Sequence, residues 1–191
     1  MYNIPKPYPS PYWINTQMYN MYPYLFWGNA QMYNMYPHTS FGKKPIYKRP
    51  FTKLKDYGSE PFVVNIEEAT EQNNTFRTAL WTGNHLQVTL MSINVGDDIG
   101  LEVHPTVDQF IRIEEGQGLV KMGDSKDSLD FQRKISDDYA IMIPAGKWHN
   151  VINTGNKPLK LYAIYAPPEH PRDTVHETKA DAESAERNYR Y

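Results

Sequence analysis

The sequence predicts an all-β domain, a sandwich or a barrel, with a low-complexity N-terminal extension and a short C-terminal helix. Apolar segments of strand length recur along residues 60–168, and Gly, Asn or Asp residues bound them, which is typical of an all-β fold. More than half of the 15 Tyr and 15 Pro residues fall within residues 1–50, so the composition changes sharply along the chain. These observations divide the 191 residues into a low-complexity segment 1–50, a domain 60–168 and a helical tail 169–191.

The N-terminal segment 1–50 is rich in Tyr, Pro, Asn and Trp. The heptapeptide QMYNMYP occurs in it twice, at Gln17–Pro23 and Gln31–Pro37. The Pro residues disfavour regular helix and central strand, and the few aliphatic side chains cannot build a core. Two interpretations follow: a disordered tail, or an aromatic segment that packs on a partner, a neighbouring subunit or a layered surface.

Short strands should build the domain, because each run contains β-branched or aromatic residues and ends at a turn-forming residue. The run at Tyr139–Ile143 is almost entirely apolar and leads into Pro144, as expected of a buried strand that ends in a turn. The expected strands are Phe62–Ile66, Thr75–Thr82, His85–Asn94, Val107–Ile113, Gly116–Met122, Leu129–Ile135, Tyr139–Ile143 and Leu159–Ala166.

Two segments are expected to be helical. Glu67–Glu71 should form a single turn, and Thr178–Arg187 a longer helix that is polar on all sides and therefore exposed. On the strand His85–Asn94, Gln87 and Thr89 alternate with apolar residues and share one face. This half-polar face is either the wall of a pocket or the solvent face of an edge strand.

Composition excludes several classes of function. The net charge of −2 and the pI of about 6.3 give no sign of a surface for nucleic acid or for anionic membranes. The absence of Cys excludes disulfides, thiolate metal ligands and a Cys nucleophile. No apolar run approaches the ~20 residues of a membrane span, and no secretory signal is recognisable, so a soluble cytoplasmic protein is the expectation.

Two stretches, Gly96–Gly118 and Pro144–Asn153, carry the candidate chemistry. In the first, Glu102 and His104 are two residues apart on an expected strand, so their side chains should leave the same face. In the second, a turn that contains Pro and Gly presents His149. Imidazole and carboxylate groups are ligands of divalent first-row metals.

These stretches resemble the paired motifs of the cupins, which are small β-barrels of the jelly-roll class. The second motif, P-x-G-x-x-H-x-x-x-N, matches at each of its marked positions: Pro144, Gly146, His149 and Asn153. The first motif, G-x5-H-x-H-x3–4-E-x6-G, fits in spacing from Gly96 to Gly116, but Glu102 replaces its first His and Gln109 replaces its Glu. The resemblance implies a double-stranded β-helix (a cupin, RmlC-like barrel) for residues 60–168, and a homodimer.

The resemblance also implies a metal site formed by Glu102, His104, Gln109 and His149. The ion would be divalent, of the Zn, Fe, Mn or Ni type, and the set keeps one carboxylate among its ligands. Asp108 is the alternative fourth ligand, although strand alternation favours Gln109. The other interpretation is a barrel with two core histidines and no metal, and His176 is the remaining histidine that could fold back over the barrel mouth.

The function implied is that of a single-domain cupin that binds or converts a small polar metabolite. Sugar isomerase-like and oxygenase-like reactions are the two chemistries that the resemblance offers, and no catalytic residue is assigned. Two alternatives remain open: a non-enzymatic binding protein, and a structural protein of the spore-coat kind that the Tyr-rich repeats of residues 1–50 anchor. No nucleic-acid or membrane partner is expected.

Overall fold

The computed structural model describes residues 51–189. The QMYNMYP repeats, and with them the two interpretations of segment 1–50, lie outside the described residues. Within the described range no helix has both the length and the apolar character needed to cross a membrane.

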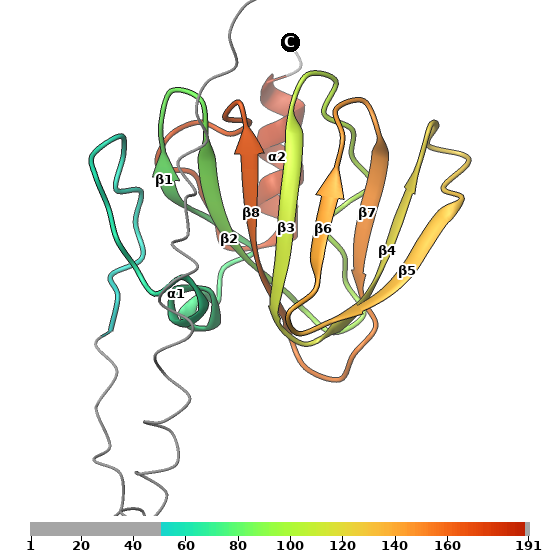
Figure 1. Cartoon of the computed structure of the whole chain (residues 1–191), viewed down its shortest axis with the longest axis horizontal. Helices are drawn as coiled ribbons and strands as arrows, with labels where there is room; N and C mark the ends of the chain where they lie inside the picture. Colours follow the sequence, from blue (N-terminus) through green and yellow to red (C-terminus); the bar gives the residue numbers. More distant parts are fainter. Residues whose placement is uncertain (1–50, 190–191) are drawn as a thin grey trace, which may run out of the picture. The chain divides into compact units, whose positions relative to one another are not determined.

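Two antiparallel sheets form the domain (Figure 1). The strand order in the larger sheet is β6-β3-β8-β2-β1-β9, and in the smaller sheet it is β5-β4-β7. The strands are β1 Arg77–Thr82, β2 Gln87–Ile93, β3 Asp108–Glu115, β4 Gln117–Gly123, β5 Phe131–Ser136, β6 Ala140–Ile143, β7 Trp148–Asn153, β8 Leu159–Ala166 and β9 Val175–His176. The helices are α1 Ile66–Gln72 and α2 Lys179–Tyr189. This arrangement confirms the predicted jelly-roll fold and its C-terminal helix.

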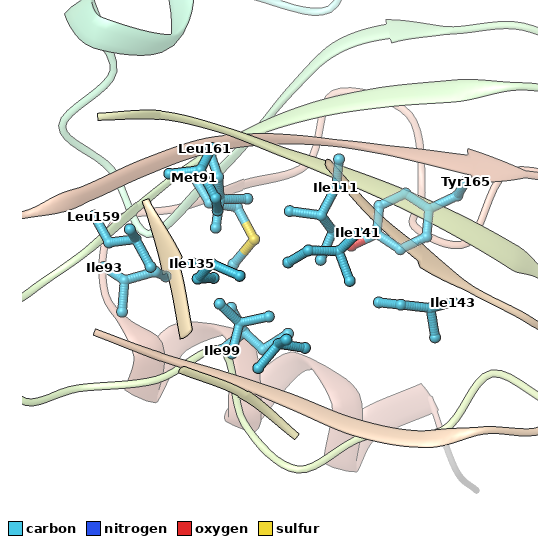
Figure 2. Packing of buried hydrophobic residues seen from close by; sticks show 14 of the residues in the cluster. Met91, Ile93, Ile99, Ile111, Ile135, Ile141, Ile143, Leu159, Leu161 and Tyr165 are labelled. Atoms are coloured by element: carbon cyan, nitrogen blue, oxygen red, sulfur yellow. The ribbon is translucent and has the colours of Figure 1, made fainter. Parts of the chain in front are cut away.

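The space between the sheets holds a continuous apolar core (Figure 2). On β3, Ile111 and Ile113 are fully buried, and on β8, Leu161 and Ala163 are also fully buried. The register places Ile111 opposite Ala163 and Ile113 opposite Leu161, so facing side chains of neighbouring strands fill the same layers. Alternation on β3 is therefore as predicted, with these two isoleucines directed inward.

The strand predicted at Phe62–Ile66 is wrong. Asn65 is the N-cap of α1, and its side-chain oxygen accepts a hydrogen bond from the backbone N–H of Glu68. The residues before it belong to no strand in the described range 51–189, and Val63 is 97% exposed. Phe62 and Val64 instead pack on a second apolar cluster that includes Leu80, on the outer face of the larger sheet.

The segment that follows β8 returns to the sheet. Strand β9 pairs with β1, which places His176 opposite Arg77. Helix α2 confirms the predicted helix, but its expected exposure on all sides is wrong at Ala182, which is 3% exposed and joins the inner core. The boundaries 1–50, 60–168 and 169–191 stay predictions.

Candidate metal centre

Two extended segments meet at the centre and bring its side chains to one face. Glu102 and His149 form an isolated antiparallel bridge, in which the N–H of each residue donates to the carbonyl of the other, at 3.0 and 2.9 Å. Because bridged residues point their side chains to the same side, the carboxylate lies beside the imidazole. The predicted strand at Glu102 is thus a single bridge, and His104 follows two residues later.

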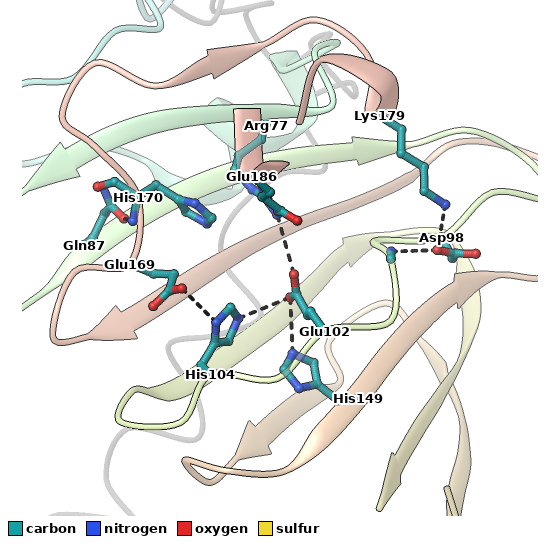
Figure 3. A network of polar contacts seen from close by, with 11 residues as sticks. Arg77, Gln87, Asp98, Glu102, His104, His149, Glu169, His170, Lys179 and Glu186 are labelled. Carbon is teal, nitrogen blue, oxygen red and sulfur yellow. Dashed lines mark hydrogen bonds and ion pairs between the residues drawn. The ribbon is translucent and has the colours of Figure 1, made fainter. Parts of the chain in front are cut away.

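The imidazole rings of His104 and His149 converge on one carboxylate oxygen of Glu102 (Figure 3). Glu102 Oε1 lies 3.2 Å from His149 Nε2 and 3.4 Å from His104 Nε2. The candidate ligand atoms of the three residues all lie within 4.8 Å of one another. The sequence-predicted residues Glu102, His104 and His149 therefore do come together, and all three are largely buried.

The other ring nitrogen of each histidine is already engaged. His149 Nδ1 lies 2.9 Å from the carbonyl oxygen of Lys147, which can only accept, so Nδ1 carries the proton. His104 Nδ1 lies 3.1 Å from Glu169 Oε1. In its neutral form the His149 ring consequently turns an Nε2 lone pair toward the carboxylate of Glu102, and the neutral His104 ring does the same when its proton lies on Nδ1, toward Glu169. Three electron-rich atoms then face one another, which requires a cation or extra protons between them.

Arg77 supplies a further positive charge to this network. Its side chain is 1% exposed, and its guanidinium lies 4.0 Å from Glu102 Oε2 and 3.7 Å from Glu186 Oε1. Its Nε and Nη1 atoms are buried without a hydrogen-bond partner among residues 51–189. A buried guanidinium of this kind stabilises the ionised form of Glu102.

The charges at the centre perturb two pKa values in opposite directions. Burial by itself would raise the pKa of Glu102, but His104, His149 and Arg77 outweigh it and hold the pKa well below its usual range. Burial by itself would lower the pKa of His104, but Glu102 and Glu169 outweigh it and raise the pKa to about 9. Without a metal, a proton on His104 therefore compensates the carboxylates, and a metal ion would have to displace it.

The donor set fits a divalent transition metal. Two ligands at about 2.1 Å from an ion are separated by about 3.0 Å in octahedral and about 3.4 Å in tetrahedral geometry. The separations of 3.2 and 3.4 Å between Glu102 Oε1 and the two histidine nitrogens fall in this range. Two imidazoles and one carboxylate, with no thiolate, match the borderline and hard metals of the first row.

Gln109 and Asp108 leave β3 on opposite faces. Gln109 is 3% exposed, and its Oε1 atom is buried without a hydrogen-bond partner in the described part of the chain. The register pairs it with Tyr165, whose ring packs edge-on against the His104 ring at 5.6 Å. Asp108 is exposed, and its Oδ1 accepts a hydrogen bond of 2.8 Å from the N–H of Ala145. Of the two predicted alternatives, only Gln109 faces the interior.

A cavity of about 480 Å³ opens beside the centre. Its lining includes Glu102 and His104 from the centre, Glu169 and His176 from the segment after β8, and Glu186 from α2. This segment and helix thus enclose one side of the site, as the sequence suggested for His176. A space of this size suits a small metabolite.

Several residues of the site escaped the sequence prediction. Arg77 and Glu169 belong to no motif, and they reach the centre only through the pairing of β1 and the return of the chain after β8. Gln87 lies on the half-polar strand face for which the sequence offered a pocket wall or a solvent face, and its side chain binds the backbone of His170. It is 0% exposed, on a central strand between β1 and β8, so the alternative of a solvent face is wrong.

Comparison with known proteins assigns the family. The family model for the cupin domain matches residues 89–165 of the sequence. YrkC of Bacillus subtilis is 74% identical over 133 residues, which cover 70% of this chain and 72% of that protein. This chain is a cupin. Protein L612 of Acanthamoeba polyphaga mimivirus is 41% identical to the cupin over 114 residues, covering 59% of this chain and 69% of L612.

A solved structure resembles the cupin closely. The crystal structure of BH2720 from Bacillus halodurans has 68% sequence identity and a TM-score of 0.68, and the match covers 69% of this chain and 99% of that one. The family expectation drawn from the two motifs is therefore confirmed. The cluster of Glu102, His104 and His149, which could hold a metal ion, lies within the region that the family model matches.

Proposed function

We propose that this cupin binds a divalent transition-metal ion through Glu102, His104 and His149, and that it binds or converts a small polar metabolite at that ion. Gln109 is the fourth ligand of the proposal, on the opposite wall of the barrel. One observation carries the proposal: two histidine Nε2 atoms face the same carboxylate oxygen at 3.2 and 3.4 Å while their Nδ1 atoms are engaged elsewhere.

Each protein group has a distinct task in this proposal. Glu102 stays ionised because His104, His149 and Arg77 together outweigh the effect of burial on its pKa, so it offers a charged ligand atom over the whole neutral pH range. The Lys147 carbonyl fixes the tautomer of His149 and keeps its Nε2 free to bind. A divalent ion held there would act as a Lewis acid toward a substrate oxygen. The cavity of about 480 Å³ provides space for that substrate.

Two reaction classes suit this centre. A set of two His and one carboxylate with open positions is the donor set of non-haem iron oxygenases, which supports an oxygenase-like reaction. A sugar isomerase-like reaction needs an acid and a base, and the cavity lining offers imidazole and carboxylate groups for these tasks in Glu169, His170 and His176. Burial and Arg77 lower the pKa of His170, so that ring stays neutral.

Elemental analysis of the purified protein tests the metal proposal. The wild type should contain about one equivalent of Zn, Fe, Mn or Ni, and the double variant His104→Ala/His149→Ala should contain none. The variant Asp108→Asn is the matched control, because Asp108 lies on the outer face of β3 and should leave the metal content unchanged. An equal metal-to-protein ratio in wild type and double variant would overturn the site assignment.

A non-enzymatic binding protein would use the same cavity, and it is distinguished by function rather than by metal content. Oxygen uptake by the Fe(II)-loaded protein and NMR of a sugar panel with the Zn- or Mn-loaded protein test the two reactions. Thermal stabilisation by a metabolite without turnover would support the binding role instead. The homodimer, the cytoplasmic location and the spore-coat alternative stay predictions, and deletion of residues 1–45 tests the last of them.

A further inference from the structure

Glu169 lies outside the proposed ligand set, and its side-chain carboxylate contacts a histidine of that set. Its Oε1 atom lies 3.1 Å from His104 Nδ1, on the side of the ring away from Glu102 (Figure 3). We infer that Glu169 is a positioning residue that orients His104 and strengthens its bond to the metal. The inference rests on the metal site proposed above.

The two histidines of the centre are held by different kinds of partner. A neutral backbone carbonyl, that of Lys147, accepts from His149 Nδ1, whereas the carboxylate of Glu169 faces His104 Nδ1. A carboxylate partner fixes the tautomer and ring orientation of a metal-binding histidine and makes its free nitrogen a stronger donor. The carboxylate of Glu169 should therefore contribute more to metal affinity than a backbone carbonyl would at the same position.

The backbone next to Glu169 is fixed from inside the barrel. The buried amide of Gln87 donates from Nε2 to the carbonyl of His170 and accepts at Oε1 from its N–H, each at 2.9 Å. The same Nε2 atom also lies 3.0 Å from Thr82 Oγ1. The loop that carries Glu169 cannot shift without breaking this pair of hydrogen bonds, so the carboxylate is held in place before any metal arrives.

Glu186 provides a control for charge alone. It also lines the cavity, but its carboxylate lies 3.7 Å from Arg77 Nη1 and forms no ion pair with a histidine in the described part of the chain. Its side chain is 47% exposed, against 31% for Glu169. Removal of either carboxylate removes one negative charge beside the centre, whereas only removal of Glu169 releases His104.

The affinity of the metal-free, full-length protein for Zn²⁺, measured by competition with a chelating dye, tests the inference. Glu169→Ala should weaken the affinity by about 10- to 100-fold. Glu186→Ala should weaken it by less than about 5-fold, as expected for a partly exposed charge. Glu169→Gln should fall between wild type and Glu169→Ala, because its amide oxygen still accepts from Nδ1 but carries no charge.

The outcomes separate this inference from the proposed function. If the wild type binds no Zn²⁺, the metal site itself is wrong, and the inference falls with it. If the wild type binds Zn²⁺ and Glu169→Ala weakens binding no more than Glu186→Ala does, only the positioning role is overturned. Circular dichroism of each variant establishes that it is folded.

A second variant tests the two hydrogen bonds by which Gln87 holds the backbone of His170, next to Glu169. Gln87→Met keeps the side-chain length but cannot hold the backbone of His170, so it should also weaken Zn²⁺ binding. In the double variant Gln87→Met/Glu169→Ala the loss should be no larger than in Glu169→Ala, because both changes act through one contact. Additive losses would show that Gln87 does not act through Glu169.

Discussion

The stability of the metal-free protein should fall as the pH rises from about 6.5 to about 9. In the folded protein the pKa of His104 is raised from its ordinary value of 6.5 to about 9, because Glu102 and Glu169 outweigh the effect of burial. Between these two pH values the folded state keeps a proton that the unfolded chain loses. Folding stability then decreases with increasing pH. The contribution of the His104 proton to stability is fully present only below about pH 6.5 and is lost as the pH rises to about 9.

The size of this effect follows from the two pKa values. At about 1.4 kcal/mol per pH unit, the interval between them corresponds to a loss on the order of 3 kcal/mol. For a domain of this size that loss lowers the midpoint of thermal unfolding by roughly 10 °C. Urea unfolding of the chelator-treated protein at pH 6 to 10, followed by circular dichroism, measures it.

His104→Asn is the control for this prediction, because its amide has no proton to lose in this range. In this variant the decrease in the free energy of unfolding between pH 6.5 and 9 should be largely absent. In metal-loaded wild type the slope should be reversed or lost, since binding requires the deprotonated ring and improves as the pH rises. A metal-free wild type whose stability stays flat or increases over this range would refute the reasoning.

Two further variants test the surroundings of the centre. Arg77→Met should destabilise the metal-free protein by about 1–3 kcal/mol in urea unfolding, because it removes one of the positive charges beside the buried carboxylate of Glu102. Added Zn²⁺ should recover part of that loss, and no recovery would speak against a metal next to Glu102. Gln109→Leu should weaken Zn²⁺ binding in the dye competition, whereas Asp108→Asn should leave it within about 3-fold of wild type. The reverse order would make Asp108 the ligand.

The sequence predicted the parts of the site that depend on local spacing. Glu102 and His104 share a side because they are two residues apart in an extended segment. His149 joins them because the second motif is a turn that leads into strand β7. The inward direction of Gln109 followed from alternation along β3. These predictions depend on the alternation of side chains along an extended backbone. They hold at Glu102 even though this segment forms a single bridge rather than a strand.

The parts that escaped prediction depend on contacts between distant segments. Arg77 meets Glu102 across the barrel, and Glu169 meets His104 only because the chain turns back after β8. Phe62–Ile66 has the alternation of a strand, but the cap at Asn65 starts a helix, and the apolar side chains find a surface to cover instead of a partner strand. Local pattern cannot distinguish these two ways of burying the same residues.

Anomalous diffraction from crystals of the metal-loaded protein tests the central claim most directly. Data collected on both sides of the absorption edge of the bound metal should show one strong peak among Glu102 Oε1, His104 Nε2 and His149 Nε2. Its distances to these atoms should be about 2.0–2.2 Å. A fully loaded crystal with no peak between these three residues, or with its peak at another place in the chain, would contradict the account.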